Sequence, residues 1–267
     1  MSKIQTDLVA GLKVRILVGL FWFSFLLVFF LVPPFDQDQG YYYFADDRPW
    51  LKIPNAFNVL SNLPFLLVGY LGLNFTHKFK KDKTKFIDQS EALAFYIAFA
   101  GIFLVALGSG WFHWMPNDWT LVPDRLPMTI GFMAILAIFI SERINLRAGQ
   151  TLLPVLLFIG VFSVGLWILG ERVTDIIPAD LRLYGLVQFF PIIALLIMLW
   201  WFPPRYTGVG YIYGIFVFYI LAKGAEEFDC FIWKLTDQII SGHSLKHLLA
   251  ALATYFLYLY IKNRKPN

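Results

Sequence analysis

Five polar residues stand at the ends of apolar runs, in a pattern that could bind a metal ion and transfer protons. Ser109 and His113 are four residues apart where one apolar run ends, and His243 and His247 have the same spacing where the last run begins. Residues four apart share one face of a helix. Two imidazoles at that spacing can both reach one metal ion, as in H-E-x-x-H metalloenzymes. Asp124 follows His113 by eleven residues.

The residue types indicate metal-assisted hydrolysis. His113, His243, His247 and Asp124 together could form a tetrahedral Zn²⁺ site with a position open to water. Such an ion lowers the pKa of bound water toward neutrality and polarises a carbonyl group. No Glu follows the first histidine of the second pair, so a general base must come from elsewhere. For His113 alone, an interhelical hydrogen bond without any metal is an equally good interpretation.

The composition places this chemistry in a membrane. Hydrophobic residues make up 58% of the 267 residues and charged residues only 15%, whereas about a quarter is usual for soluble domains. The single cysteine, Cys230, excludes an internal disulfide and a cysteine-rich metal site. The net charge of +4 is best explained as a topology signal, and nucleic acid is not expected as a partner.

Apolar runs of about 17–25 residues predict membrane-spanning helices. The runs lie near residues 15–33, 57–74, 91–113, 124–141, 151–169, 184–202, 209–225 and 243–261. We therefore expect an all-α membrane protein with eight spans. The first run ends at Pro33-Pro34 and lacks a small-residue cleavage site, which favours a retained anchor over a signal peptide.

The loop charges predict the orientation of the chain. Basic residues mark cytoplasmic loops, and alternating the eight spans separates the basic clusters from the acidic ones. The basic clusters lie near residues 3–15, 78–85, 143–147, 205 and 262–265, and the acidic ones near 36–47, 118, 175–180 and 226–237. Both termini are therefore expected in the cytoplasm, and the third, fourth and eighth spans bring the histidines together at the outer face.

The spacing of these residues resembles that of the alkaline ceramidase family, part of the CREST superfamily of intramembrane metal hydrolases. The resemblance rests on Ser109-Gly-Trp-Phe-His113, on Asp124 followed by Arg-Leu-Pro-Met, and on His243-Ser-Leu-Lys-His247. The segment Asn58-Val-Leu-Ser-Asn62, which opens the second span, is similar to the family's Asn-x-x-Ser-Asn element. The similarity covers roughly residues 55–261.

The resemblance implies a seven-helix bundle over residues 55–262, preceded here by an additional anchor helix in residues 1–34. It implies that His113, His243 and His247 bind zinc, that Asp124 is the acid/base, and that Ser109 holds the nucleophilic water or stabilises the oxyanion. The implied reaction splits the amide of a ceramide or a related N-acyl lipid into a fatty acid and an amine.

Some members of the family also carry a calcium site before the Asn-x-x-Ser-Asn helix. Here Asn55 stands where a Glu would be expected, and Lys52 adds a repelling positive charge. Calcium binding is therefore doubtful.

Two other classes of function remain open from the residues. One is a receptor on the same scaffold, like the adiponectin receptors, although the tail after the last span is short. The other is a transporter or proton-relay protein, which should show internal repeats that this sequence lacks.

Several residues beside the predicted site have simpler interpretations. Glu226, Glu227 and Asp229 are expected in a solvated acidic loop; the alternative is that they orient the ligand histidines through hydrogen bonds. Gly108 and Gly110 are expected to allow close helix packing. The aromatic residues near span ends are expected at the membrane interface; they include Trp111, Trp114, Trp119 and Tyr184.

Overall fold

The computed structural model describes residues 3–172 and 178–267, which form helices joined by short segments, with no strand in these two ranges. Eight helical stretches of the described residues are long and apolar enough to cross a membrane, which confirms the predicted all-α membrane protein. These stretches lie in α1 (Lys3–Leu31), α2 (Ala56–Leu60) with α3 (Leu63–Phe79), α4 (Glu91–Trp114), α5 (Asp118–Arg143), α6 (Leu146–Arg172), α7 (Arg182–Trp201), α8 (Val209–Glu227) and α10 (Gly242–Asn263). The short helices η1 (Gln39–Tyr42) and α9 (Asp229–Leu235) lie between spans.

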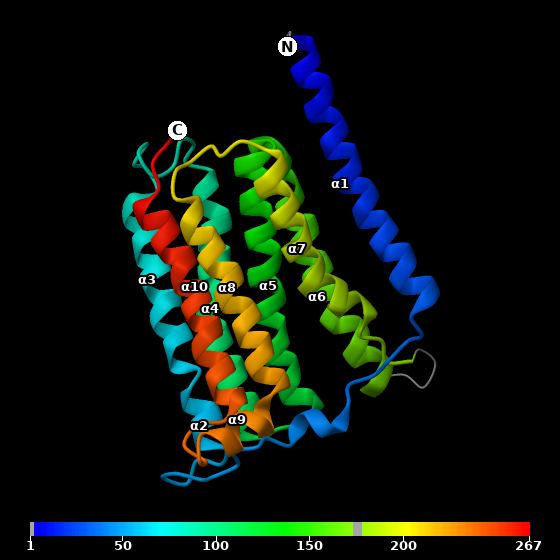
Figure 1. The fold of residues 1–267 in the computed structure, drawn as a ribbon, viewed down its shortest axis with the longest axis vertical. Coiled ribbons are helices and arrows are strands. Elements are labelled where there is room, and N and C mark those ends of the chain that lie inside the picture. Colours follow the sequence, from blue (N-terminus) through cyan, green and yellow to red (C-terminus); the bar gives the residue numbers. More distant parts are fainter. Residues whose placement is uncertain (1–2, 173–177) are drawn as a thin grey trace.

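The long helices run roughly parallel or antiparallel in one bundle (Figure 1). Helix α4 packs between α3 and α5, α6 packs on α5, and α10 packs between α8 and α3. Helix α1 stands at the outside and contacts α7. The start of α1 and the C-terminus lie at one end of the bundle, and α2 and α9 lie at the other (Figure 1).

The start of α5 differs from the sequence prediction. Asn117 caps the helix by accepting the backbone N–H of Thr120 at 3.1 Å, and the Thr120 hydroxyl accepts the Asn117 N–H in return. This capping box satisfies two free donors of the first turn. The helix therefore begins at Asp118, six residues before the predicted start, and Asp124 lies in its second turn. The prediction that Asp124 opens the fourth span was wrong.

The second span is broken where a continuous run was predicted. Ser61 and Asn62 separate α2 from α3, and Pro64 follows within the first turn of α3. The side chains of Asn58, Ser61 and Asn62 are buried although all three are polar. The break therefore places three hydrogen-bonding side chains inside the bundle, at the end where α2 and α9 lie.

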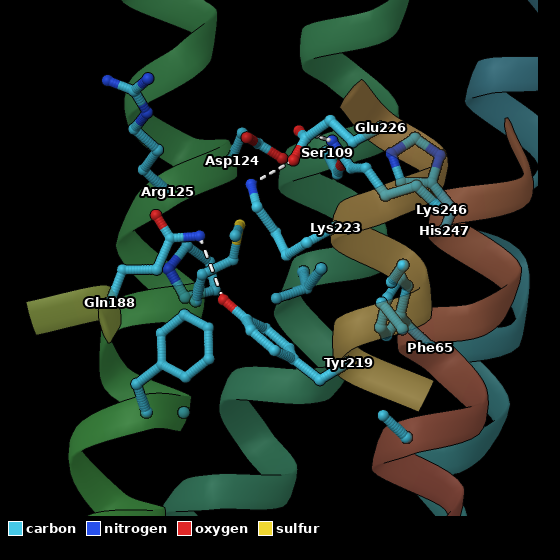
Figure 2. Close-up of a pocket in the computed structure, with 18 of the residues that line it drawn as sticks. Phe65, Ser109, Asp124, Arg125, Gln188, Tyr219, Lys223, Glu226, Lys246 and His247 are labelled. Carbon is cyan, nitrogen blue, oxygen red and sulfur yellow. Dashed lines mark hydrogen bonds and ion pairs between the residues drawn. The ribbon is translucent and has the colours of Figure 1, made fainter. Parts of the chain in front are cut away.

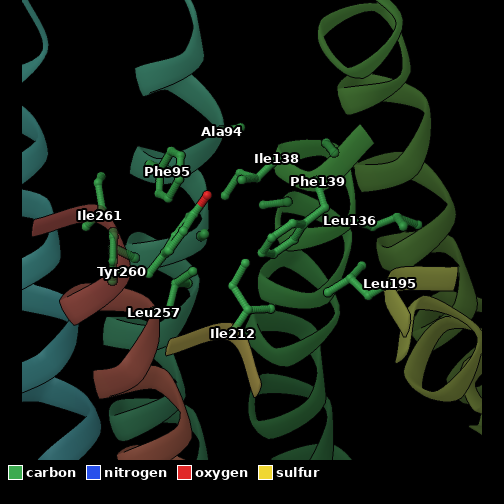
Figure 3. Close-up of a cluster of buried hydrophobic side chains, with 14 of the residues drawn as sticks. Ala94, Phe95, Leu136, Ile138, Phe139, Leu195, Ile212, Leu257, Tyr260 and Ile261 are labelled. Carbon is green, nitrogen blue, oxygen red and sulfur yellow. The ribbon is translucent and has the colours of Figure 1, made fainter. Parts of the chain in front are cut away.

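Large apolar side chains fill the interior of the bundle toward the end where the C-terminus lies (Figure 3). Phe99 from α4, Phe139 from α5 and Ile261 from α10 are completely buried in this cluster. Burial of this kind is the main favourable contribution between helices wherever lipid is excluded. The core fixes the relative positions of α4, α5 and α10, which carry the predicted site residues.

Close packing of α4 against α5 depends on Gly108. A Cβ atom at Gly108 would lie 1.8 Å from the carbonyl oxygen of Pro123, so only glycine allows this approach. The predicted packing role is confirmed for Gly108. It is wrong for Gly110, where a Cβ would meet open space. The contact holds Ser109 and Asp124, the residues that follow Gly108 and Pro123, next to each other.

A buried polar network lies at the end of the bundle opposite α2 and α9. The Arg264 guanidinium, which is completely buried, contacts the carboxylates of Glu142 and Glu91. Tyr260 donates a hydrogen bond to Glu142 at 2.6 Å, and Tyr206 donates one to Glu91 at the same distance. The segment after α10 is thereby tied to α4 and α5.

Candidate metal centre

Three histidines meet at the end of the bundle where α2 and α9 lie. His113 comes from the last turn of α4, and His243 and His247 come from the first two turns of α10. Their ring centroids are 4.8 to 4.9 Å apart, and one ring nitrogen of each lies within 4.8 Å of the others. All three side chains are buried. The structure thus brings together three residues that lie up to 134 positions apart in the sequence.

The nitrogen atoms of this cluster fit a metal ion. His113 Nδ1 is buried and has no hydrogen-bond partner among the described residues. A buried polar atom without a partner is costly and calls for an explanation. Three neutral imidazole nitrogens facing one another suit a divalent transition metal, and zinc sites with three histidines are common. The cluster can therefore hold a metal ion with further positions left for water or substrate.

The break between α2 and α3 supplies the side chain that orients His247. Ser61 Oγ lies 2.8 Å from His247 Nδ1, and Asn62 Nδ2 lies 3.4 Å from the same atom. A hydrogen bond on one ring nitrogen directs the other toward a metal. Asn58 accepts the Ser244 hydroxyl at 2.8 Å and so ties this break to α10. The sequence analysis identified Asn58, Ser61 and Asn62 as part of a motif but did not predict these contacts.

The start of α10 is fixed by two acceptors. The Ser241 hydroxyl caps the helix by accepting the Ser244 N–H at 3.0 Å. Asp229 Oδ1 accepts the backbone N–H of His243 at 2.7 Å, and Asp229 Oδ2 accepts the Ala45 N–H at 3.1 Å. Asp229 was predicted in a solvated loop, and this was wrong. Its carboxylate joins the segment before α2 to the helix that carries two histidines.

Asp124 and Ser109 lie side by side at the same end of the bundle. Asp124 comes from the second turn of α5, Ser109 comes from the last two turns of α4, and their side chains are hydrogen-bonded. Both are buried. Asp124 and Ser109 line one cavity together with His247. The structure therefore places the predicted acid/base and hydroxyl next to the histidines.

A second charged group lies on the α8 and α10 side of the cavity. Glu226 Oε1 accepts a hydrogen bond from Lys246 Nζ at 2.7 Å, and Lys223 contacts the other carboxylate oxygen (Figure 2). Lys246 Nζ also lies 3.3 Å from His243 Nε2. The prediction that Glu226 belongs to a solvated loop was wrong, because the packing of α8 on α10 brings it against Lys246. Glu227, by contrast, is exposed.

The cavity that these residues share has a volume of about 710 Å³. One end is polar and carries the charged and hydroxyl groups described above (Figure 2). The lining beyond them is mostly apolar and includes Phe65, Ile102, Val105, Ile135 and Leu257. One polar pair lies among these side chains, because Gln188 donates a hydrogen bond to the Tyr219 hydroxyl at 3.3 Å (Figure 2). Ligand pockets of this size with few polar groups hold small organic molecules or lipid chains. The arrangement suits a molecule with a polar group at one end and a long apolar chain.

The segment between α1 and α2 covers the histidines. The Phe44 ring lies 4.7 Å from His113 and 5.0 Å from His243, measured between centroids. Tyr41 lies 6.3 Å from His243, and burial raises the pKa of Tyr41, so its hydroxyl stays protonated near neutral pH. The sequence assigned no role to these aromatic residues, because nothing local shows that this segment folds back over the site.

Two predictions beside the site have different outcomes. Tyr184 was expected at the membrane interface and is instead buried against Arg125, so this prediction was wrong. Trp111, Trp114 and Trp119 are exposed, in agreement with an interfacial position.

In the loop before α2, where calcium binding was considered doubtful, the positive charge of an arginine side chain pairs with an acidic residue. Asp46 is buried and pairs with the Arg48 guanidinium at 2.8 Å. Asn55 and Lys52 both adopt left-handed backbone conformations, with φ of 47° and 65°. The Asn55 side chain donates to the His113 carbonyl at 2.9 Å. The loop therefore supports the histidine cluster through the backbone of α4.

The comparisons with known proteins agree with the geometry. The model of the family described as Ceramidase matches residues 52–265, which cover α2 to α10 and include the three histidines, Ser109 and Asp124, but not the segment between α1 and α2 that lies over the histidines. No curated protein sequence matches the chain.

Proposed function

Because the chain belongs to the Ceramidase family, we propose that it is a zinc-dependent membrane hydrolase that splits the amide of a ceramide or a related N-acyl lipid. The family match supports hydrolysis of an amide bond in a lipid. The observation that carries the finer proposal is a cluster of three buried histidines, of which His247 lines the polar end of a cavity that is mostly apolar elsewhere. Such a cavity places a scissile amide beside the histidines while an acyl chain fills the apolar part.

His113, His243 and His247 are the residues that would hold the metal. Zinc bound there would lower the pKa of water and polarise the amide carbonyl. Ser61 keeps the His247 ring in a fixed orientation through its 2.8 Å contact with Nδ1. Phe44 excludes bulk water from two of the imidazoles. A site shielded in this way strengthens electrostatic interactions with the substrate.

Asp124 would carry the protons of the reaction. Its carboxylate accepts a proton from the attacking water and then delivers a proton to the leaving amine nitrogen as the C–N bond breaks. The products are a fatty acid and a free amine, and the atoms of one water molecule are divided between them. The Ser109 hydroxyl donates to the Asp124 carboxylate in the resting site. Once Asp124 has taken a proton from the attacking water, the single Ser109 proton would turn to the oxyanion that develops on the carbonyl oxygen.

The decisive experiment combines metal analysis with lipid mass spectrometry. We expect the purified protein to contain one zinc per chain and to release fatty acid from ceramide. The double variant His243→Ala/His247→Ala should lose both the zinc and the activity. The matched control is His77→Ala, since His77 is the fourth histidine and lies exposed in the last turn of α3.

Retention of zinc by the double variant would refute the proposed ligands. Zinc binding without any release of fatty acid from ceramide or other N-acyl lipids would refute the proposed reaction.

A further inference from the structure

One cation that lines the cavity, Arg125, forms no ion pair with a carboxylate among residues 3–172 and 178–267. Arg125 follows Asp124 on α5, is 7% exposed, and lines the cavity together with Gln37 and Tyr184. Figure 2 shows it on the α5 side, across from His247 and Lys246 on α10. Lys246 and Lys223 differ from it, because both pair with Glu226.

The guanidinium of Arg125 is held between two aromatic rings. Its Cζ atom lies 4.7 Å from the ring centroids of both Trp167 and Tyr184. Nη2 donates a hydrogen bond to the side-chain oxygen of Gln37. Nη1 is buried and has no hydrogen-bond partner in residues 3–172 and 178–267, and no ion pair joins Arg125 to a carboxylate in these ranges.

The two rings and Gln37 fix the Arg125 side chain, but the Nη1 donor has no acceptor among the described residues. Burying a charged donor without an acceptor costs more free energy than ring contacts usually return. The cost is removed when a ligand brings an acceptor. A guanidinium whose faces are covered by rings presents its edge, which matches the planar or tetrahedral oxygen atoms of acidic groups.

We propose that Arg125 binds an acidic group, such as a carboxylate, phosphate or sulfonate, on the amine half of the substrate. This inference rests on the proposed hydrolysis of an N-acyl lipid. The apolar end of the cavity, lined by Ile102 and Ile135, takes the acyl chain, and Asp124 takes the position beside the leaving nitrogen. Arg125 adjoins Asp124 at the polar end, so the group it meets belongs to the amine that leaves. The enzyme therefore prefers acidic N-acyl lipids over neutral ones.

The test uses two amides that differ at a single group, which is an anion in one and neutral in the other. N-palmitoylserine carries a carboxylate where N-palmitoylserinol carries a hydroxymethyl group. We expect the full-length, metal-loaded protein to hydrolyse N-palmitoylserine with a kcat/KM about 10- to 100-fold higher, as one charge-assisted hydrogen bond predicts. Arg125→Gln should abolish most of this preference by raising KM for the acid, and Arg125→Lys should keep part of it. Arg205→Gln is the matched control, because Arg205 pairs with Glu91 at the far end of the bundle.

Binding without turnover separates this inference from the proposed reaction. In the Asp124→Asn variant, N-palmitoylserine should raise the melting temperature more than N-palmitoylserinol does, and Arg125→Gln in that background should remove the difference. If the wild-type protein hydrolyses neither of these amides nor ceramide but this difference is seen, the reaction is refuted and the acid-binding role of Arg125 stands. Equal hydrolysis and equal stabilisation by the two amides would refute the role of Arg125 alone.

A third arm distinguishes the substrate's acidic group from the carboxylate of the released fatty acid. We expect inhibition by palmitate to be the same in the wild type and in Arg125→Gln. Relief of palmitate inhibition in Arg125→Gln, with no change in the preference between the two amides, would overturn the proposal.

Discussion

Proton transfer and metal binding are assigned to different side chains in this site. Asp124 shares a hydrogen bond with Ser109 on one side of the cavity, and the three histidines form a cluster of their own. The second turn of α5 holds Asp124, and Asn117 caps that helix. Asp124 is therefore not needed as a helix cap, and a substitution there tests chemistry more than folding.

We expect Asp124→Asn to lower turnover about 10²- to 10⁴-fold, the usual effect of losing a general acid/base. The amide is the same size as the carboxylate and can keep a hydrogen bond with Ser109, so the zinc content and melting temperature should change little. All three quantities are measured on one preparation. Asp82→Asn, a partly exposed residue between α3 and α4, is the control. Full activity with normal zinc would remove Asp124 from the mechanism.

Ser61→Ala should weaken metal binding without removing a ligand. The hydroxyl fixes the ring of His247, and loss of such an orienting contact typically lowers metal affinity about 10- to 100-fold. Competition with a zinc chelator measures this change. Ser90→Ala, at the exposed start of α4 and remote from the histidines, should leave the affinity unaltered. An unchanged affinity in Ser61→Ala would mean that the ring is held by its packing alone.

At the scale of elements, the geometry of the site depends on how closely two helices approach. The carbonyl oxygen of Pro123 lies where a side chain at Gly108 would be, and the next residues along each helix are Ser109 and Asp124. The Pro123 carbonyl oxygen belongs to the backbone of α5, so it cannot move out of the way by a side-chain rotation. Any side chain at this position must therefore separate α4 from α5.

Gly108→Ala should destabilise the protein by about 1–3 kcal/mol, the usual cost of overpacking, and lower the activity as well. Gly110→Ala is a close control on the same helix, because its Cβ would meet open space and alanine favours helix. Melting temperatures and ceramide hydrolysis are compared for the two variants. Equal stability of both variants would show that α5 can move without harm.

The elements also show what the sequence could and could not predict. The eight spans follow from long apolar runs, which are local patterns. The meeting of the three histidines follows from the spacing of His243 and His247 and from the alternation of the spans across the membrane. The start of α5 was missed because the capping box of Asn117 and Thr120 lies in a stretch interrupted by Pro123. The pairing of Glu226 with Lys246 depends on the packing of α8 against α10, which no single segment encodes.

At the scale of the whole molecule, the two ends of the bundle have different chemistry. The start of α1 and the C-terminus lie at one end, and the histidines lie at the other (Figure 1). The basic clusters of the loops gather at the first end, and such clusters stay in the cytoplasm. We propose on this basis that both termini are cytoplasmic and that the site faces the outer side of the membrane.

Cysteine labelling tests this orientation. The background is Cys230→Ala, and single cysteines replace Lys81 and Asp47, which are both exposed but lie at opposite ends of the bundle. A membrane-impermeant maleimide added outside intact cells should label the cysteine at position 47 and not the one at position 81. The reverse pattern would move the site to the cytoplasmic face.

The buried network around Arg264 has a consequence for the biogenesis of the protein. The ribosome makes α10 after the other spans, so Glu142 enters the membrane before its partners Tyr260 and Arg264 exist. His113 is likewise synthesised before His243 and His247, which complete its cluster. Until the last helix has been inserted, the Glu142 carboxyl lacks its two partners and must be protonated or exposed to water. The proposed metal could be bound by all three histidines only after that step.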